Sequence, residues 1–153
     1  MKRVFIIFFL CLFLFGCDNS EEQLRNKYLN MKNNLLDEIE YTDRNNLPLE
    51  IETVIDRVDE ENIKYKIILK NPKENMTKIK AMVVHNYYTE DLFPSIGIFD
   101  EERELLVGMD KSLELDDSIE TTKNISQIDL EFRVWIEYYN DFGQKKEIYY
   151  KTT

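Results

Sequence analysis

The sequence predicts a mainly β protein, an antiparallel β-sandwich of about seven strands with one amphipathic helix in front of it. Two observations lead to this fold class. Apolar residues recur every three or four positions before residue 41 and every second position from residue 49 onward, so the periodicity changes from helical to strand-like. About seven short strand patterns then follow in roughly 105 residues, and no helical pattern lies between them to connect parallel strands.

The chain begins with a short leader, residues 1–16. Lys2 and Arg3 precede an unbroken apolar run at 4–15, which at about 1.5 Å of rise per residue reaches roughly 18 Å as a helix. A bilayer core is about 30 Å thick, so this run is too short to span it. A basic start followed by a short apolar run is typical of a secretory signal peptide.

The leader ends in Leu14-Phe15-Gly16-Cys17, which resembles the lipobox of bacterial lipoproteins. In that family the cysteine is diacylated on sulfur and becomes the first residue after cleavage. The resemblance therefore implies a lipid anchor on Cys17 that holds the protein at the outer side of the cell membrane, with residues 17–20 as the tether. An ordinary cleaved signal peptide and an uncleaved N-terminal anchor are the alternatives.

Residues 21–41 are predicted to form an amphipathic helix. Ser20, followed by two glutamates and Gln23, is a candidate capping box, and the stretch TDRNNLP, with Pro48 as the stop, ends the helix. One apolar stripe recurs at spacings of four, three, four and four, and it consists of Leu24, Tyr28, Met31, Leu35 and Ile39. We expect this stripe to pack on the β domain or on a partner protein.

Residues 49–153 are predicted to form the β-sandwich domain. The pattern is clearest at 63–69, where apolar residues alternate with lysines, and at 128–139, where one face is entirely apolar. The other strands before the last hairpin are expected at 49–58, 78–88, 95–99, 104–107, and 112–115 running into 118–121.

The register of the last hairpin can be predicted from its turn. Asn140-Asp141-Phe142-Gly143 suits a type I turn with glycine in the left-handed position, which gives a three-residue loop and a bulge. A shift of one residue would mix apolar and polar faces, so the register is well specified. Pairing Asn140 with Gln144 sets these cross-strand pairs: Ile136 with Ile148, Val134 with Tyr150, Trp135 with Tyr149, and the like-charged Glu137 with Glu147.

Two stretches, IILKNPKENMTKIKAMVVHNYY and VWIEYYNDFGQKKEIYY, resemble the immunoglobulin-like or fibronectin-like domains of small bacterial envelope lipoproteins. The resemblance covers most of residues 49–153 and is one of strand spacing, because the Cys…Trp…Cys signature of antibody domains is absent. It implies an immunoglobulin-like sandwich that binds or spaces other molecules and carries no standard catalytic residues.

Charge and cysteine content narrow the possible partners. Removal of Lys2 and Arg3 with the leader leaves 18 basic and 30 acidic side chains, a net charge of about −12. Nucleic acid is therefore not expected as a partner, since binding it needs a basic surface. Cys11 lies in the leader and Cys17 carries the lipid, so we expect no disulfide, no zinc site and no other cofactor.

No residue pattern predicts catalysis. His85 is the only histidine, its strand parity faces the core, and no Gly-x-Ser-x-Gly elbow accompanies it, so a buried structural role is favoured over a catalytic one. The acidic clusters at 100–104 and 116–117 lack the spacing of a calcium loop and are expected to be solvated turns. With 30 acidic residues, a carboxylate pair for glycan hydrolysis stays an open alternative.

The candidate binding residues are Trp135, Tyr139 and Tyr149, whose shared parity puts them on the outer face of the last hairpin. Either the helix covers this face, or the aromatics form an exposed binding patch. The sequence thus predicts a lipid-anchored, non-catalytic interaction module for an envelope protein or peptide. An acidic inhibitor or immunity lipoprotein that captures a basic enzyme, and a small glycan hydrolase of the envelope, are the alternatives.

Overall fold

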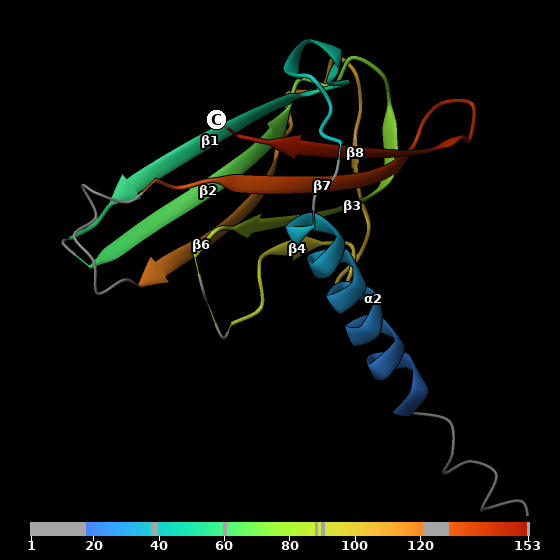
Figure 1. Ribbon diagram of the computed structural model, residues 1–153. Helices are drawn as coiled ribbons and strands as arrows, with labels where there is room; N and C mark the ends of the chain where they lie inside the picture. The colour runs from blue at the N-terminus through green and yellow to red at the C-terminus, as the bar shows by residue number, and fades with distance from the viewer. Residues whose placement is uncertain are drawn as a thin grey trace, which may run out of the picture.

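The computed structural model describes residues 18–37, 40–59, 61–87, 89, 91–120 and 129–152. It confirms the predicted fold class, because an antiparallel two-sheet β body follows one helix (Figure 1). The first sheet has the order β1-β2-β6 and consists of β1 (Glu50–Arg57), β2 (Asn62–Lys70) and β6 (Leu113–Glu120). The second has the order β4-β3-β7-β8, with β5 also paired to β3, and consists of β3 (Met76–His85), β4 (Ser95–Ile96), β5 (Arg103–Leu105), β7 (Phe132–Tyr139) and β8 (Lys145–Lys151).

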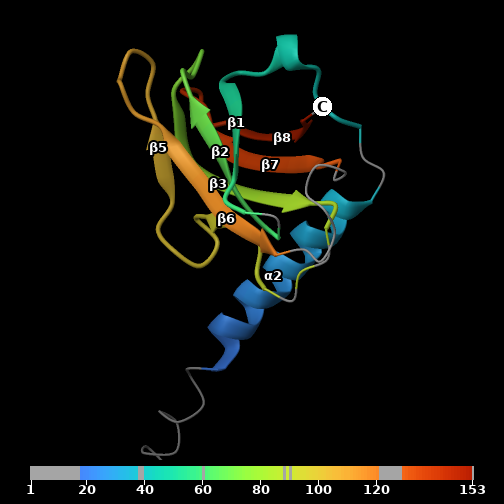
Figure 2. The same ribbon diagram turned by 90° about the vertical axis from the view of Figure 1, so that its left-hand side faces the viewer.

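The chain passes back and forth between the two sheets. After the β1–β2 hairpin it crosses to β3, returns to place β6 beside β2, and crosses again to the β7–β8 hairpin (Figure 2). Lettered as in immunoglobulin domains, β1, β2 and β6 occupy the positions of strands A, B and E, and β3, β7 and β8 those of C, F and G.

The main core lies between the sheets and is built from alternate residues of each strand. In β2 the inward residues are fully buried or nearly so, and they are Ile63, Tyr65, Ile67 and Leu69. Strand β7 is buried at almost every position, because it is covered on both sides. Val134 and Ile136 face the main core, whereas Trp135 belongs to a second cluster beneath the helix.

Two strands fall furthest short of their predicted length, for local reasons. The segment expected at 95–99 is a strand only at Ser95–Ile96, because Gly97 adopts a φ of 69° and donates its N–H to Asp100 Oδ1 at 2.6 Å. The strand expected at 128–139 begins at Phe132; residue 128 lies outside the described residues. Before Phe132, the side chain of Asn86 donates to the carbonyl of Asp129 at 2.8 Å and accepts the N–H of Glu131 at 3.1 Å.

The β7–β8 hairpin has the predicted register. Trp135 lies opposite Tyr149 and Glu137 opposite Glu147, and the N–H of Asn140 donates to the carbonyl of Gln144 at 3.1 Å. Gly143 has a φ of 69°, as the predicted turn requires. The like-charge pair is bridged, because Lys145 Nζ lies 2.7 Å from a carboxylate oxygen of Glu137 and 2.9 Å from one of Glu147.

Helix α2 (Asp18–Leu36) starts three residues before the predicted helix and ends five residues before residue 41. Its carboxyl-terminal half packs on the outer face of the second sheet, where Tyr28 and Leu35 are buried against β3 and β7. Side chains 21–26 are all exposed, so the amino-terminal turns extend beyond the β body (Figure 1). Ile39 lies outside the described residues. Within the part of the chain that is described, no helix combines the length and apolarity needed to cross a bilayer.

Candidate functional site: an open groove beside strand β1

One side of the sandwich is open along β1. The register places Ile55 of β1 on the same inward face as its neighbour Tyr65 of β2. Tyr65 is 2% exposed, but Ile55 is 43% exposed. Side chains that point into a sandwich are normally covered by the opposite sheet, and at Ile55 this cover is missing.

The uncovered region is a groove of about 780 Å³ that reaches from β1 to the end of β8. Its walls include inward-facing residues of both sheets; most of these are buried, and Ile55 is the most exposed apolar residue among them. The apolar lining consists of Leu47, Leu49, Ile51, Ile55, Leu130, Phe132 and Tyr150. An accessible apolar concavity of this size is typical of a binding site.

The rim of the groove carries charges of both signs. Glu52 is ion-paired with Lys70, and the hydrogen bond to Glu52 raises the pKa of the Lys70 ammonium. Glu50 accepts a hydrogen bond of 2.8 Å from the side-chain amide of Asn71. Arg44 and Lys73 lie at the same end of the groove, and neither is in an ion pair within the described residues.

The backbone edge of β1 also differs from that of β8. Strand β8 is the last strand of its sheet, but the N–H of Thr42 donates to the carbonyl of Tyr149 at 2.7 Å and occupies part of its edge. For β1, the described backbone hydrogen bonds all go to β2. An unpaired strand edge beside an apolar groove can accept another strand.

The predicted aromatic residues do not form one exposed patch. Trp135 is 4% exposed and packs with Tyr28 and Leu35 of α2, while Tyr149 is partly buried beside the same cluster. Tyr139 is separate from this cluster and lies under the ammonium of Lys78, whose Nζ is 5.5 Å from the ring centroid. Trp135 therefore belongs to the packing between helix and sheet.

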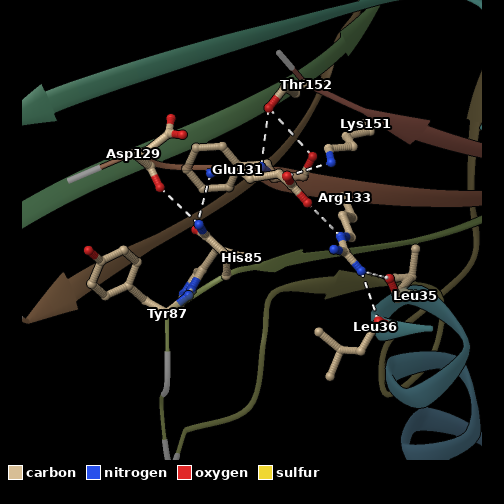
Figure 3. Close-up of polar contacts among 11 residues, drawn as sticks. Leu35, Leu36, His85, Tyr87, Asp129, Glu131, Arg133, Lys151 and Thr152 are labelled. Carbon is tan, nitrogen blue, oxygen red and sulfur yellow. Dashed lines mark hydrogen bonds and ion pairs between the residues drawn. The ribbon is translucent and has the colours of Figure 1, made fainter. Parts of the chain in front are cut away.

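His85 is 3% exposed and is enclosed by aromatic rings. Its ring centroid lies 4.9 Å from that of Phe93 and 5.6 Å from that of Tyr65, both in edge-to-face geometry. The Nδ1 atom accepts the N–H of Tyr87 at 3.2 Å (Figure 3). Burial lowers the pKa of the imidazole, so the neutral form is favoured. These contacts make His85 part of the core.

A polar network that the sequence analysis did not single out joins β7, β8 and α2 (Figure 3). The carboxylate of Glu131 lies 2.8 Å from Arg133 Nε and 2.5 Å from Lys151 Nζ. Arg133 in turn donates to the last carbonyls of α2. The ion pairs could have been predicted from the sequence. The predicted register puts Lys151 opposite Arg133, and Glu131 lies two residues before Arg133, on the same face of the strand.

The acidic clusters have structural contacts in this fold. Asp100 accepts the Gly97 N–H and pairs with Arg103 at 3.3 Å, and Asp117 accepts the N–H of Ser118 at 2.7 Å. In the described part of the chain, no three His, Cys, Asp or Glu residues are grouped so as to hold a metal ion. Cys17 lies outside the described residues, directly before the start of α2.

The chain matches no family model, no curated protein and no solved structure.

Proposed function

We propose that this protein is a lipid-anchored protein of the bacterial cell envelope, facing the extracytoplasmic side, whose β-sandwich is a non-catalytic interaction module. Its partner in this proposal is another envelope protein or a peptide segment of one. The observation that carries the proposal is the accessible apolar groove beside the unpaired edge of β1.

The leader supports the membrane attachment. Leu14, Gly16 and Cys17 occupy the lipobox positions, and α2 starts at the next residue, Asp18. Two acyl chains on Cys17 would hold the protein stably at the bilayer. Because side chains 21–26 of α2 are exposed, about ten residues of helix would separate the β body from the lipid by roughly 15 Å.

The groove supports binding. Ile55, an inward-facing apolar residue, is 43% exposed beside an open strand edge, and this combination favours recognition or assembly there. His85 and Trp135 are buried, whereas Ile55 of β1 is exposed, so β1 is the better candidate for contact with a partner.

An acidic inhibitor of a basic enzyme is the second candidate, and the acidic residues along β1, Glu50, Glu52 and Asp56, favour it. Such a complex would be driven by charge and would weaken sharply as salt rises, because screening acts strongly on exposed charges. Binding that persists in high salt would favour the apolar groove.

The attachment is tested by two cysteine variants in the natural host. Cys17→Ser should abolish metabolic labelling with a palmitate analogue and should change membrane fractionation or leader processing. Cys11→Ser is the matched control, since it changes the other cysteine and should leave both readouts as in wild type. An unmodified Cys17 thiol in the intact mass of the native protein would rule out the anchor.

A further inference from the structure

We propose that the groove binds an extended segment of the partner, which joins the first sheet as a strand beside β1 and alternates apolar and basic side chains. This inference rests on the proposed interaction function and deepens it by naming the chemistry of the partner. The free backbone edge of β1, its inward side chains and its outward side chains each specify one property of that segment.

The backbone specifies a strand. β1 contains eight residues, and its described backbone bonds go only to β2. The donors and acceptors on its other edge can be satisfied by an added strand, which is a recurrent mode of peptide recognition. The corresponding edge of β8 is less open, because Thr42 already bonds to Tyr149 there.

The inward face specifies apolar residues. Ile51, Thr53 and Ile55 alternate along this side of β1, and their exposure increases from 8% at Ile51 to 43% at Ile55. An added strand places every second side chain beside this row and over the apolar lining of the groove. Apolar side chains there would remove Ile55 and its neighbours from water.

The outward side chains of β1 favour basic side chains on the same face of the added strand. Glu50, Glu52 and Asp56 point to this side, and on the β2 side the register sets Lys70 opposite Glu50 and Lys64 opposite Asp56. Strand β2, NIKYKIILK, thus already pairs with β1 through alternating apolar and basic residues. A strand with the same alternation fits the unpaired edge, since each carboxylate can accept several hydrogen bonds.

The same charges oppose pairing of β1 with a second copy of itself. The two antiparallel self-registers with the longest overlap that keep the apolar face inward set two acids opposite each other, Glu50 with Asp56 in one and Glu52 with Asp56 in the other. Like charges directly opposite are destabilising in a sheet. The occupant is therefore a different, basic sequence.

Two cations at one end of the groove favour one direction for the added strand. Arg44 and Lys73 lie near the start of β1, where the carbonyl of Pro48 accepts the N–H of Lys73 at 2.7 Å. A segment antiparallel to β1 would bring its carboxyl-terminal end to these two cations. We expect an acidic side chain or a terminal carboxylate at that end of the segment.

The test uses the full-length lipoprotein in zwitterionic detergent micelles, with empty micelles as the blank. The probe is a dye-labelled peptide as long as β2, with alternating isoleucine and lysine and a free carboxyl terminus, and its binding is followed by fluorescence anisotropy. A scrambled peptide of the same composition should bind at least about tenfold more weakly. Two further peptides carry backbone N-methyl groups at alternate residues. Methylation of the N–H groups that face β1 should abolish binding, and methylation of the N–H groups that face away from β1 should preserve it.

Two pairs of variants locate the site. Ile55→Ser should weaken peptide binding about tenfold, whereas Val54→Ser, equally exposed on the opposite face, should change it less than about twofold. Asp56→Lys should weaken binding of the basic peptide. Asp116→Lys is the matched control, because Asp116 also lies opposite a lysine of β2 but belongs to β6 on the other side of that strand. This variant should not weaken binding of the peptide. Unchanged thermal unfolding of each variant shows that it is folded.

Equal binding of the scrambled peptide, or equal binding of the two N-methylated sets, would overturn the strand proposal. Crosslinking in native membranes separates this failure from failure of the proposed function. A partner that crosslinks equally to wild type and to Ile55→Ser would show that the groove is not the binding site, but it would still support the proposed interaction function. Absence of any crosslinked partner, together with absence of peptide binding, would overturn both.

Discussion

The guanidinium of Arg133 closes the carboxyl end of α2, because its Nη1 donates to the carbonyl of Leu35 at 3.1 Å and to that of Leu36 at 2.9 Å (Figure 3). The last carbonyls of a helix have no partners within the helix. Here a residue of β7 supplies the donor, and Glu131 holds the same guanidinium through Nε at 2.8 Å. One side chain thus links the end of the helix to the sheet.

Replacement of Arg133 by methionine should lower the free energy of unfolding by about 1–2 kcal/mol, because two carbonyls lose a charged donor. Methionine keeps much of the apolar stem, so the loss reports the hydrogen bonds. The measurement is urea denaturation. Arg103→Met, which removes only an exposed pair with Asp100, is the control and should cost less than about 1 kcal/mol. Equal losses for the two variants would show that the cap is not significant.

A buried hydrogen bond between Tyr28 and Phe93 also attaches the helix to the body. The hydroxyl of Tyr28 accepts the N–H of Phe93 at 2.6 Å, and Tyr28 is 1% exposed. Tyr28→Phe should cost about 1–3 kcal/mol, since a buried N–H is left without an acceptor. Tyr139→Phe removes a hydroxyl that makes no hydrogen bond within the described residues, and should change stability by less than about 0.5 kcal/mol.

The only tryptophan, Trp135, gives a second readout for Tyr28→Phe because it lies in the same cluster. We expect wild-type tryptophan emission to be that of a buried indole, with a shift to longer wavelength if the variant loosens α2. Emission typical of a solvated indole in the wild type would contradict the helix cover.

Local signals in the sequence explain which parts of the structure could be predicted. The hairpin register follows from the turn at 140–143 and from alternation on both sides of it, and all of this information lies within about twenty residues. The last carbonyls of α2 bond to Arg133, almost a hundred residues away, and helical periodicity carries no information about this contact, so the predicted helix was too long. The open groove was not predicted, because alternation identifies the inward face of β1 but not whether another layer covers Ile55.

Acid should destabilise the fold through His85. Burial lowers the pKa of this imidazole in the folded state, and the charge of Asp117 only partly opposes this. The unfolded chain therefore binds a proton more readily, and stability decreases as pH falls below the unfolded pKa of about 6.5 and toward the lower folded value.

His85→Gln should remove this pH dependence, although the substitution itself lowers stability. The measurement is the midpoint of thermal unfolding between about pH 7.5 and about pH 5.5, a range above the usual pKa of carboxylates. Parallel curves for the variant and the wild type would show that His85 does not titrate differently on unfolding.

The bridge made by Lys145 should stabilise the like-charge pair of the last hairpin. Burial opposes ionisation of Glu137, which is 7% exposed, but Lys145 and Lys80 hold the pKa of its carboxyl below the usual value. A depressed pKa means that the stabilisation is present above the unfolded pKa and is lost as pH falls through the folded one.

Lys145→Met should therefore reduce stability at neutral pH by about 1 kcal/mol, a modest value because the Lys145 side chain is half exposed and Lys80 stays near Glu137. Lys146→Met is the control in the same strand, since Lys146 is in no ion pair within the described residues. The difference between the two variants should shrink as pH falls and Glu137 becomes protonated. If it stayed constant down to about pH 3, the effect of Lys145 would come from packing of its aliphatic stem and not from its charge.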